Sequence, residues 1–174
     1  MRREDEVRTF NVAGAPEERA FILEIQFRSG GRIRLKIGQL MDAISRLFVW
    51  QGKAAESVTI LDSEETVVVS SWTTIRMWEA ASKFHSRPTN SAPYTVRGSA
   101  GGNIEEHPSR SLKEAITIAI SWFADGSCKP DWAHVVGPNG RVVLSHRELW
   151  RMHCADARSR GEPMPKRVRR RVAA

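Results

Sequence analysis

The sequence predicts an α+β fold made of two tandem ββαββα repeats. Runs of alternating apolar and polar residues occur in pairs around turn residues, which is typical of antiparallel hairpins. Each pair is followed by apolar residues at helical spacing. The order strand, strand, helix occurs four times along the chain, twice in each repeat. We therefore expect two antiparallel sheets, each with helices on one face, related by a pseudo-twofold axis.

The first repeat is expected over residues 20–85. FILEIQF and RIRLKI alternate on either side of Ser29-Gly30-Gly31, so they predict a hairpin. From Gln39 the apolar spacing becomes helical, which predicts an amphipathic helix to about residue 51. SVTIL and TVVVS then predict a second hairpin around a polar turn. Thr73 or Thr74 is expected to cap the closing helix, which would reach about Phe84.

The second repeat is expected over residues 93–157, after a linker at 86–92 that is polar and contains a proline. YTVRG and a weaker strand near Ile104 flank a glycine-rich turn. Ser111 and Glu114 form a capping-box pattern before the helix SLKEAITIAISWFA. WAHVV and RVVLS surround a Pro-Asn-Gly turn. HRELWRMHCADARS predicts the last helix.

Both ends of the chain are polar. Residues 1–19 are expected to form a flexible arm, with VRTFNV as a possible short edge strand, and residues 158–174 a basic disordered tail.

The two repeats also match in residue identity, which favours a duplication. Six of the fourteen positions from Val67 to Ala80 are identical to their counterparts from Val142 to Ala155. The alternative is that unrelated ββα units share valines in strands and alanines in helices. The matches in this register are Val67/Val142, Val68/Val143, Ser70/Ser145, Arg76/Arg151, Met77/Met152 and Ala80/Ala155. At an offset of 72 residues, Leu40/Leu112, Ala43/Ala115, Ile44/Ile116 and Trp50/Trp122 are identical. At an offset of 71 residues, Gly30/Gly101, Gly31/Gly102 and Ile33/Ile104 are identical.

The helix over 111–124 is apolar around much of its circumference, so we expect it to be buried on more than one side. It could form the seam between the repeats, a homodimer contact, or the core of its own repeat.

The net charge of +7 is concentrated at the C-terminus. Residues 158–174 hold seven basic residues and one acidic residue, a net +6, whereas residues 1–157 hold 20 and 19, a net +1. The function predicted from this pattern is a non-enzymatic nucleic-acid-associated protein, DNA-binding or regulatory, that contacts phosphates through a basic hairpin and the tail. The candidate binding residues are Arg28, Arg32, Arg34, Lys36, Lys166, Arg167, Arg169, Arg170 and Arg171.

The alternative function is a protein–protein interaction module, such as an inhibitor, an adaptor or a secreted effector of a mobile element. The tail resembles the arginine-rich translocation signal of type IV secretion substrates, through Arg160, Arg167, Arg169 and Arg171. The segment SLKEAITIA…AHVVGPNGRVVL resembles small bacterial domains in which a Leu-x-x-Ala helix precedes a valine-rich hairpin.

No nucleotide, zinc-protease or hydrolase motif is present, so no enzyme activity and no cofactor are expected. Ser145, His146 and Glu148 suggest a catalytic triad, but Ser145 is better explained as a helix cap with Glu148 as its partner. A metal site is not expected, because the spacing of the candidate ligands is unlike that of zinc sites. These candidates are Cys128, Asp131, His134, His146, His153 and Cys154.

The cellular setting is expected to be cytoplasmic. Two cysteines are too few for a disulfide scaffold, and the sequence holds neither a secretory signal nor an apolar run long enough to cross a membrane.

Overall fold

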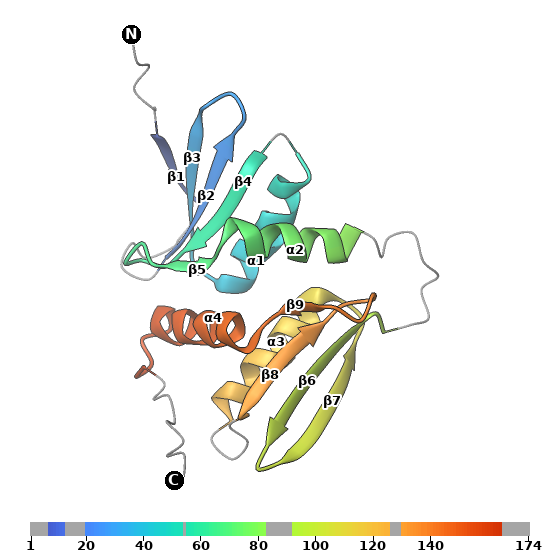
Figure 1. Cartoon of the computed structure of the whole chain (residues 1–174). Coiled ribbons are helices and arrows are strands. Elements are labelled where there is room, and N and C mark those ends of the chain that lie inside the picture. Colours follow the sequence, from blue (N-terminus) through green and yellow to red (C-terminus); the bar gives the residue numbers. More distant parts are fainter. Residues whose placement is uncertain (1–6, 13–19, 54, 83–91, 126–129, 165–174) are drawn as a thin grey trace, which may run out of the picture.

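The computed structural model describes residues 7–12, 20–53, 55–82, 92–125 and 130–164. These residues form two sheets and four helices (Figure 1). The predicted α+β class is therefore confirmed, and the sheets are mainly antiparallel as expected. None of the described helices is long and apolar enough to span a membrane.

Sheet 1 belongs to the first half of the chain, and its strands lie in the order β1-β3-β2-β4-β5. β1 runs parallel to β3, and all other neighbours are antiparallel. The elements of this half are β1 (Val7–Asn11), β2 (Phe21–Phe27), β3 (Arg32–Ile37), α1 (Leu40–Gln51), β4 (Ala55–Leu61), β5 (Val67–Val69) and α2 (Ser71–Ser82).

Sheet 2 belongs to the second half, and its strands lie in the antiparallel order β7-β6-β8-β9. The elements of this half are β6 (Tyr94–Ala100), β7 (Asn103–Ser109), α3 (Leu112–Ala124), β8 (Trp132–Val136), β9 (Val142–Leu144) and α4 (His146–Ser159).

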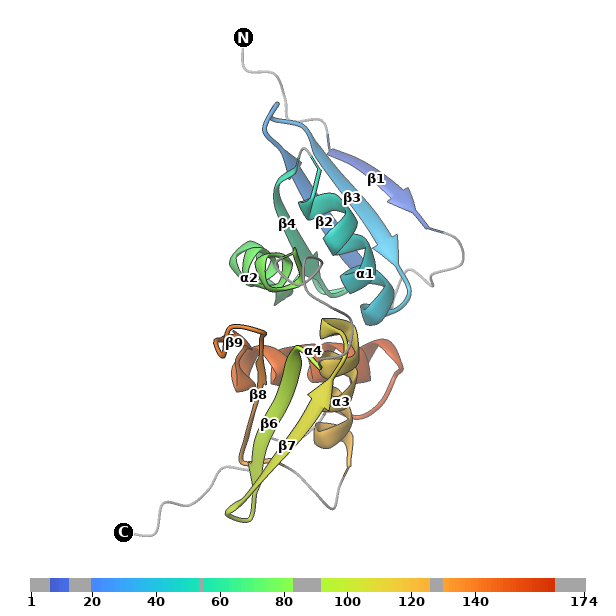
Figure 2. The same ribbon diagram turned by 90° about the vertical axis from the view of Figure 1, so that its right-hand side faces the viewer.

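The two halves meet through α2 and α4, which lie in the middle of the molecule in both views (Figures 1 and 2). Each of these helices contacts a strand of its own sheet and the short edge strand of the other sheet. α2 packs against β4 and β9, and α4 packs against β8 and β5. Buried hydrophobic residues from both halves form one continuous core cluster. The halves are thus joined by shared apolar packing.

The second hairpins of the two halves have the same backbone pattern, in the register that matches Val67 with Val142. The N–H of Asp62 donates to the Thr66 carbonyl at 3.0 Å, and the N–H of Gly137 donates to the Arg141 carbonyl at 2.9 Å. Both hairpins have a bulge, one at the end of β4 and one at the end of β8. Their turns each contain a residue with positive φ, 59° at Glu65 and 72° at Gly140.

The first hairpins do not follow the predicted match of Ile33 with Ile104. Ile33 pairs with the buried Ile25 and shares its face of sheet 1. Ile104 pairs with Ser99, next to the core-facing Gly98, and is 66% exposed. Ile33 and Ile104 therefore do not occupy equivalent positions in the two sheets. The predicted alignment is off by one residue, and a shift of one residue moves a strand side chain to the opposite face. The strand pairing gives Ile33 of β3 a different counterpart. Ile25 lies between Ile33 and Val58 in sheet 1, as Gly98 lies between Glu105 and Ala133 in sheet 2, so Ile33 corresponds to Glu105 of β7.

The ends of the chain and of α2 also need correction. Val7–Asn11 forms the edge strand β1, which confirms the edge strand suggested for VRTFNV and means that this part of the expected flexible arm is ordered in the sheet. α4 ends at Ser159, as predicted for this helix, so the expected start of the tail at residue 158 is two residues too early. α2 begins at Ser71, and Ser70 Oγ rather than a threonine accepts the N–H of Thr73 at 3.2 Å. The linker at 86–91 and the tail from 165 lie outside the described residues.

α3 packs mainly within its own half, against β6, β7, β8 and α4, and makes a smaller contact with α1. Lys113 Nζ lies 3.3 Å from Ser45 Oγ in that contact. The seam is formed chiefly by α2 and α4, so the apolar surface of α3 is explained by burial in its own half and beside α1.

Candidate functional site

The predicted basic residues of β3 lie on the outer face of sheet 1, where carboxylates surround them. Arg34 Nε donates to Glu24 at 2.8 Å, and its two terminal nitrogens approach the Glu65 carboxylate at 3.0 and 3.4 Å. The hydrogen bond with Glu24 raises the pKa of Arg34 above its usual value, in spite of an opposite effect of burial, and Glu65 adds to the increase. Arg34 is thus already neutralised within the fold.

Arg32 is held in a similar way. Its Nε donates to Gln26 Oε1 at 3.1 Å, and its guanidinium lies 3.8 Å from Glu24. Lys36 stands further along the same face, and it also has an interaction partner. Two carboxylates therefore balance much of the charge of these three cations, so the face is mixed in charge rather than basic.

Arg28 is placed differently from the other hairpin cations. It lies at the exposed tip between β2 and β3, where an open hollow of about 370 Å³ is lined by Phe27, Arg28, Ser29 and Lys53. The pairing of Phe27 with Ala55 brings Lys53 to this tip. The hollow therefore combines two cationic side chains and a hydroxyl group.

Aromatic rings support one wall of this hollow. The rings of Phe27 and Trp50 meet edge to face with centroids 6.0 Å apart. Lys53 Nζ lies 5.4 Å from the Trp50 ring centroid, which is a cation–π distance. We call Phe27, Arg28, Ser29, Trp50 and Lys53 the tip site. The sequence did not point to Lys53 because it follows α1, far from Arg28 along the chain, and only the β2–β4 register joins them.

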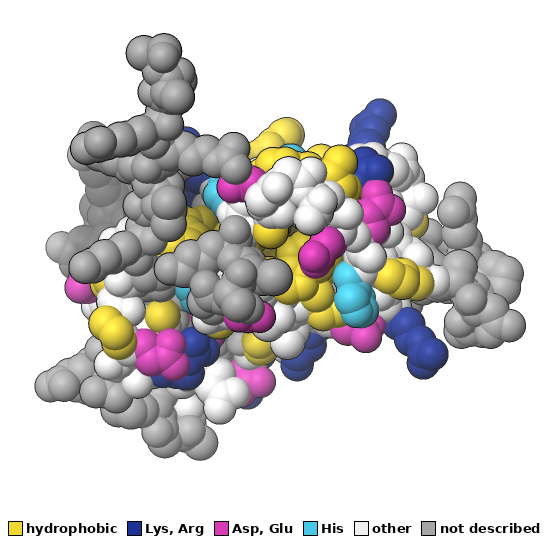
Figure 3. Space-filling view, turned by 90° about the horizontal axis from the view of Figure 1, so that it is seen from below, with side chains coloured by type: hydrophobic (Ala, Val, Ile, Leu, Met, Phe, Trp, Pro, Cys, Tyr) yellow, Lys and Arg dark blue, Asp and Glu magenta, His cyan; other side chains and the backbone are white. Residues whose placement is uncertain are grey.

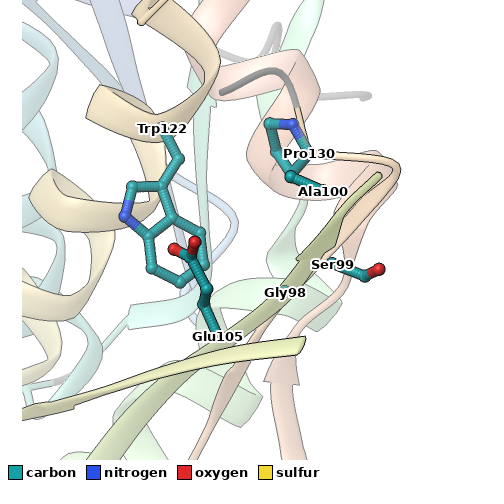
Figure 4. A pocket seen from close by; sticks show the side chains of 6 residues that line it. All are labelled: Gly98, Ser99, Ala100, Glu105, Trp122 and Pro130. Carbon is teal, nitrogen blue, oxygen red and sulfur yellow. The ribbon is translucent and has the colours of Figure 1, made fainter. Parts of the chain in front are cut away.

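The second half has a smaller hollow beside Trp122, the residue that the sequence comparison matches with Trp50. It is lined by Gly98, Ser99, Ala100, Glu105, Trp122 and Pro130 (Figure 4). Ala100 corresponds in register to Phe27, so the ring that packs on Trp50 has no counterpart beside Trp122. The space measures about 20 Å³, which is enough for a water molecule.

The outer face of sheet 2 is more apolar than that of sheet 1. Trp132 and His134 lie on this face with ring centroids 5.3 Å apart, and burial lowers the pKa of His134. Ile104 of β7 and Val142 of β9 are exposed on the same face. Figure 3 views the molecule from the sheet 2 end, where hydrophobic side chains lie among acidic, basic and histidine side chains. The outer face of sheet 2 thus combines aromatic and aliphatic side chains with polar ones.

The residues that suggested a triad form a helix cap. Glu148 accepts hydrogen bonds from the N–H and the Oγ–H of Ser145, at 2.9 and 2.7 Å. His146 Nδ1 accepts the N–H of Ala133 at 3.1 Å, so this nitrogen is turned toward β8 and not toward Ser145. The expected capping role of Ser145 is confirmed.

The candidate metal ligands are not gathered in the described part of the chain. No group of three or more His, Cys, Asp or Glu side chains there could hold a metal ion. His153 is buried against the rings of Phe123 and Trp150, and burial raises the pKa of the Cys154 thiol. Cys128 and the tail cations Lys166, Arg167, Arg169, Arg170 and Arg171 lie outside the described residues.

Comparison with known proteins adds no relationship to this geometry. No family model matches the chain, and no curated protein and no solved structure matches it.

Proposed function

We propose that this chain is a non-enzymatic nucleic-acid-associated protein that binds the phosphate backbone through the tip site and the basic C-terminal tail. The observation that carries the proposal is the exposed pairing of Arg28 and Lys53 around one hollow. Two cations at one tip can hold adjacent phosphates, and the neighbouring aromatic wall offers a surface for a sugar or a base. The tail adds a dense run of cations, at 166, 167 and 169–171.

The cations of β3 have a secondary part in this proposal. Arg32, Arg34 and Lys36 extend the surface away from the tip, but Glu24 and Glu65 would have to be displaced before Arg34 could contact a phosphate. The energetic contribution of Arg34 to binding should therefore be smaller than that of Arg28. If phosphates were simply attracted to every arginine of the hairpin, Arg28 and Arg34 would contribute equally to binding. The present proposal instead expects a larger contribution from Arg28.

The test is binding of fluorescent single-stranded and double-stranded DNA and RNA, measured by anisotropy as a function of salt. We expect binding at low salt, with each neutralised phosphate adding about 0.9 to the log–log salt slope. The double variant Arg28→Gln/Lys53→Gln should lower the slope by roughly one to two and weaken affinity about equally for all sequences. Replacement of the tail cations by glutamine should lower the slope further.

Arg34→Gln is the matched control, since it removes a neighbouring arginine that the fold already neutralises. Its effect on binding should be smaller than that of the double variant Arg28→Gln/Lys53→Gln or of Arg28→Gln alone. Absence of binding to any DNA or RNA at about 20 mM salt would refute the proposal, because electrostatic binding is strongest there. An equal effect of Arg34→Gln and Arg28→Gln would place the binding surface on the sheet face instead.

The second candidate function is a protein–protein interaction module, favoured by the outer face of sheet 2. Trp132, His134 and Val136 lie along β8 on this face. Val142 of the neighbouring strand β9 lies on the same face, and so does Ile104 of β7, on the far side of β6. A face of half-buried and exposed aromatic and aliphatic side chains is typical of a contact surface. Affinity purification with and without nuclease separates the two functions, because a protein complex made by this face should withstand nuclease.

The proposal also includes the origin of the scaffold as a tandem ββαββα duplication. Its support is the shared pattern of hydrogen bonds, bulge and positive φ in the two second hairpins, all in the register that matches Val67 with Val142. A profile of homologues of residues 20–82 should align with residues 93–159 so that Leu40 falls on Leu112 and Val67 on Val142. Failure of homologues to align there would argue for convergence on similar hairpins.

A further inference from the structure

The two sheets differ at one edge. In sheet 1 the outer edge of β3 is covered by β1, whereas the corresponding edge of β7 in sheet 2 has no strand beside it among the described residues. Residues 103–108 of β7 are all exposed. An edge strand of this length offers unpaired N–H and C=O groups to any extended chain. Within the described ranges, one edge is thus covered by the chain itself and its counterpart is open.

The β1–β3 pairing shows how such an edge is filled. Val12 N–H donates to the Lys36 carbonyl at 3.1 Å, so the backbone of Lys36 faces β1. By the alternation along a strand, Arg32 and Arg34 face β1 as well. The registers relate these positions to Ile104, Glu106 and Pro108 of β7. Pro108 has no N–H, so a parallel strand on β7 would lose one of its ladder bonds and keep the others.

The side chains along this edge show which residue an incoming strand should carry. Glu105 and Trp122 line the same small hollow, and the Glu105 side chain reaches toward the indole ring (Figure 4). An acidic group beside an aromatic ring favours a cation, through an ion pair and a cation–π contact together. In sheet 1 the residue that corresponds to Glu105 is Ile33, and it stands opposite Arg8 of β1. A basic residue thus already occupies the equivalent place in the covering strand.

We propose that the open edge of β7 binds an extended segment of a partner protein, aligned parallel to β7, with a lysine or arginine of that segment held by Glu105 and Trp122. The main-chain ladder supplies affinity and the basic side chain supplies specificity, as in other cases of strand addition. Arg97 already pairs with Glu106 at 2.5 Å, which leaves Glu105 as the carboxylate that selects the cation. This site is separate from the tip site, and the proposal does not depend on nucleic-acid binding.

The test uses the full chain and a labelled synthetic peptide, EVRTFNV, with the sequence of residues 6–12, because this segment contains β1. We expect saturable binding by fluorescence anisotropy and slower hydrogen exchange at the amides of Ile104 and Glu106. Replacing the peptide's arginine by glutamate, or Glu105 by lysine in the protein, should each weaken binding about tenfold or more. Combining the two changes should restore much of the affinity. Glu79→Lys, an equal change of charge at an exposed position of α2, should have no effect.

Three outcomes would overturn the proposal. One is the absence of binding at millimolar peptide. Another is binding that Glu105→Lys does not change, which would mean that the peptide replaces β1 beside β3 instead of binding to β7. The third is peptide binding that appears only after residues 165–174 are deleted, because the edge would then belong to the chain's own tail. Far-ultraviolet circular dichroism of the Glu105 variant checks that the fold is intact.

Discussion

Thr73 Oγ1 donates a 2.6 Å hydrogen bond to Glu148 Oε1, and the two residues occupy the same position, the third, in α2 and α4. They are related by the same offset in sequence as Asp62 and Gly137 of the two second hairpins. A contact between matched positions is what the proposed duplication would produce if its two halves were related by a twofold axis. Arg76 adds an ion pair to the same carboxylate. The centre of the seam is therefore a polar contact on one glutamate.

Replacement of Glu148 should destabilise the seam and the start of α4 together. Glu148→Gln removes the ion pair with Arg76 and weakens the hydrogen bonds from Ser145 and Thr73. We expect a loss of about 1–3 kcal/mol in the free energy of unfolding, since these bonds go to a mostly buried charged group. Urea unfolding near neutral pH measures it. Glu79→Gln, an exposed change on α2, should alter stability by less than about 0.5 kcal/mol.

The effect of Glu148→Gln should depend on pH. Burial acts to raise the pKa of Glu148, but the hydrogen bonds from Thr73 and Ser145 and the charge of Arg76 outweigh burial and lower it below 4.5. A lowered folded-state pKa gives stability that is present above the unfolded value and is lost as pH falls through the folded one. The difference between wild type and variant should thus shrink below about pH 4.5. A difference that stays constant to about pH 3 would contradict the assigned charge interaction.

Arg158 should contribute to stability although Arg160, on the same segment, should not. Arg158 crosses the seam to Asp62, a buried carboxylate, at 2.6 Å, and to Glu64 at 3.0 Å. Within the described part of the chain, Arg158→Ala would leave Asp62 with the N–H groups of Glu64 and Thr66 as its hydrogen-bond partners. We expect a loss of about 1–2 kcal/mol, measured by thermal unfolding.

Arg160 is the control for that variant, because its partners Asp156 and Glu162 are near neighbours on the surface of the same segment. Exposed pairs of this kind contribute about 0–1 kcal/mol. Equal losses for Arg158→Ala and Arg160→Ala would show that the seam pair adds nothing beyond a surface ion pair.

Gly98 should tolerate no side chain, because the Trp122 ring lies directly on its backbone. A Cβ at this position would stand 2.8 Å from the ring and 2.9 Å from the Trp132 carbonyl oxygen. Gly98→Ala should therefore cost about 1–3 kcal/mol through overpacking. Gly31→Ala is the control, since nothing lies within 4 Å of its Cβ position. Similar stabilities of the two variants in urea would mean that Trp122 can move away easily.

The sequence predicted most of this fold because its two periodicities are clear. The final helix was predicted over 146–159 with the observed bounds, since Ser145 and Glu148 mark its start. The match between the first hairpins was predicted incorrectly because their glycine-rich turns can be aligned in either of two adjacent registers with equal ease. The correct register depends on which residue each strand residue faces in the core. Gly98, which lies opposite Ala133, has no apolar side chain, so the pattern of apolar residues did not mark it as a core position.

The candidate binding surfaces could be read from the sequence only in part. Alternation places Arg32 and Arg34 on the outer face of β3, but the cross-strand Glu24 and the distant Glu65 neutralise Arg34 there. Long-range pairing likewise brings Lys53 to the hairpin tip. Such pairs depend on the register between segments, which local pattern does not determine.

His153 should make the protein less stable in mild acid. Its ring is buried among Phe123 and Trp150, and its Nδ1 has no hydrogen-bond partner among the described residues. Burial lowers the pKa of His153, and the charge of Arg160 adds to this, against opposing effects of Asp156 and Glu162. A histidine with a lowered folded-state pKa binds more protons when unfolded, so stability falls as pH drops below the usual value of 6.5.

The measurement is thermal unfolding at about pH 7.5 and pH 5.5, on either side of the usual histidine pKa. The unfolding temperature of wild type should be lower at the acidic pH, and His153→Leu should reduce the difference, because leucine cannot take up the proton that the buried ring resists. His107→Gln, an exposed change on β7, should retain it. A variant at position 153 with the same pH dependence as wild type would assign the acid sensitivity to another histidine, such as His134.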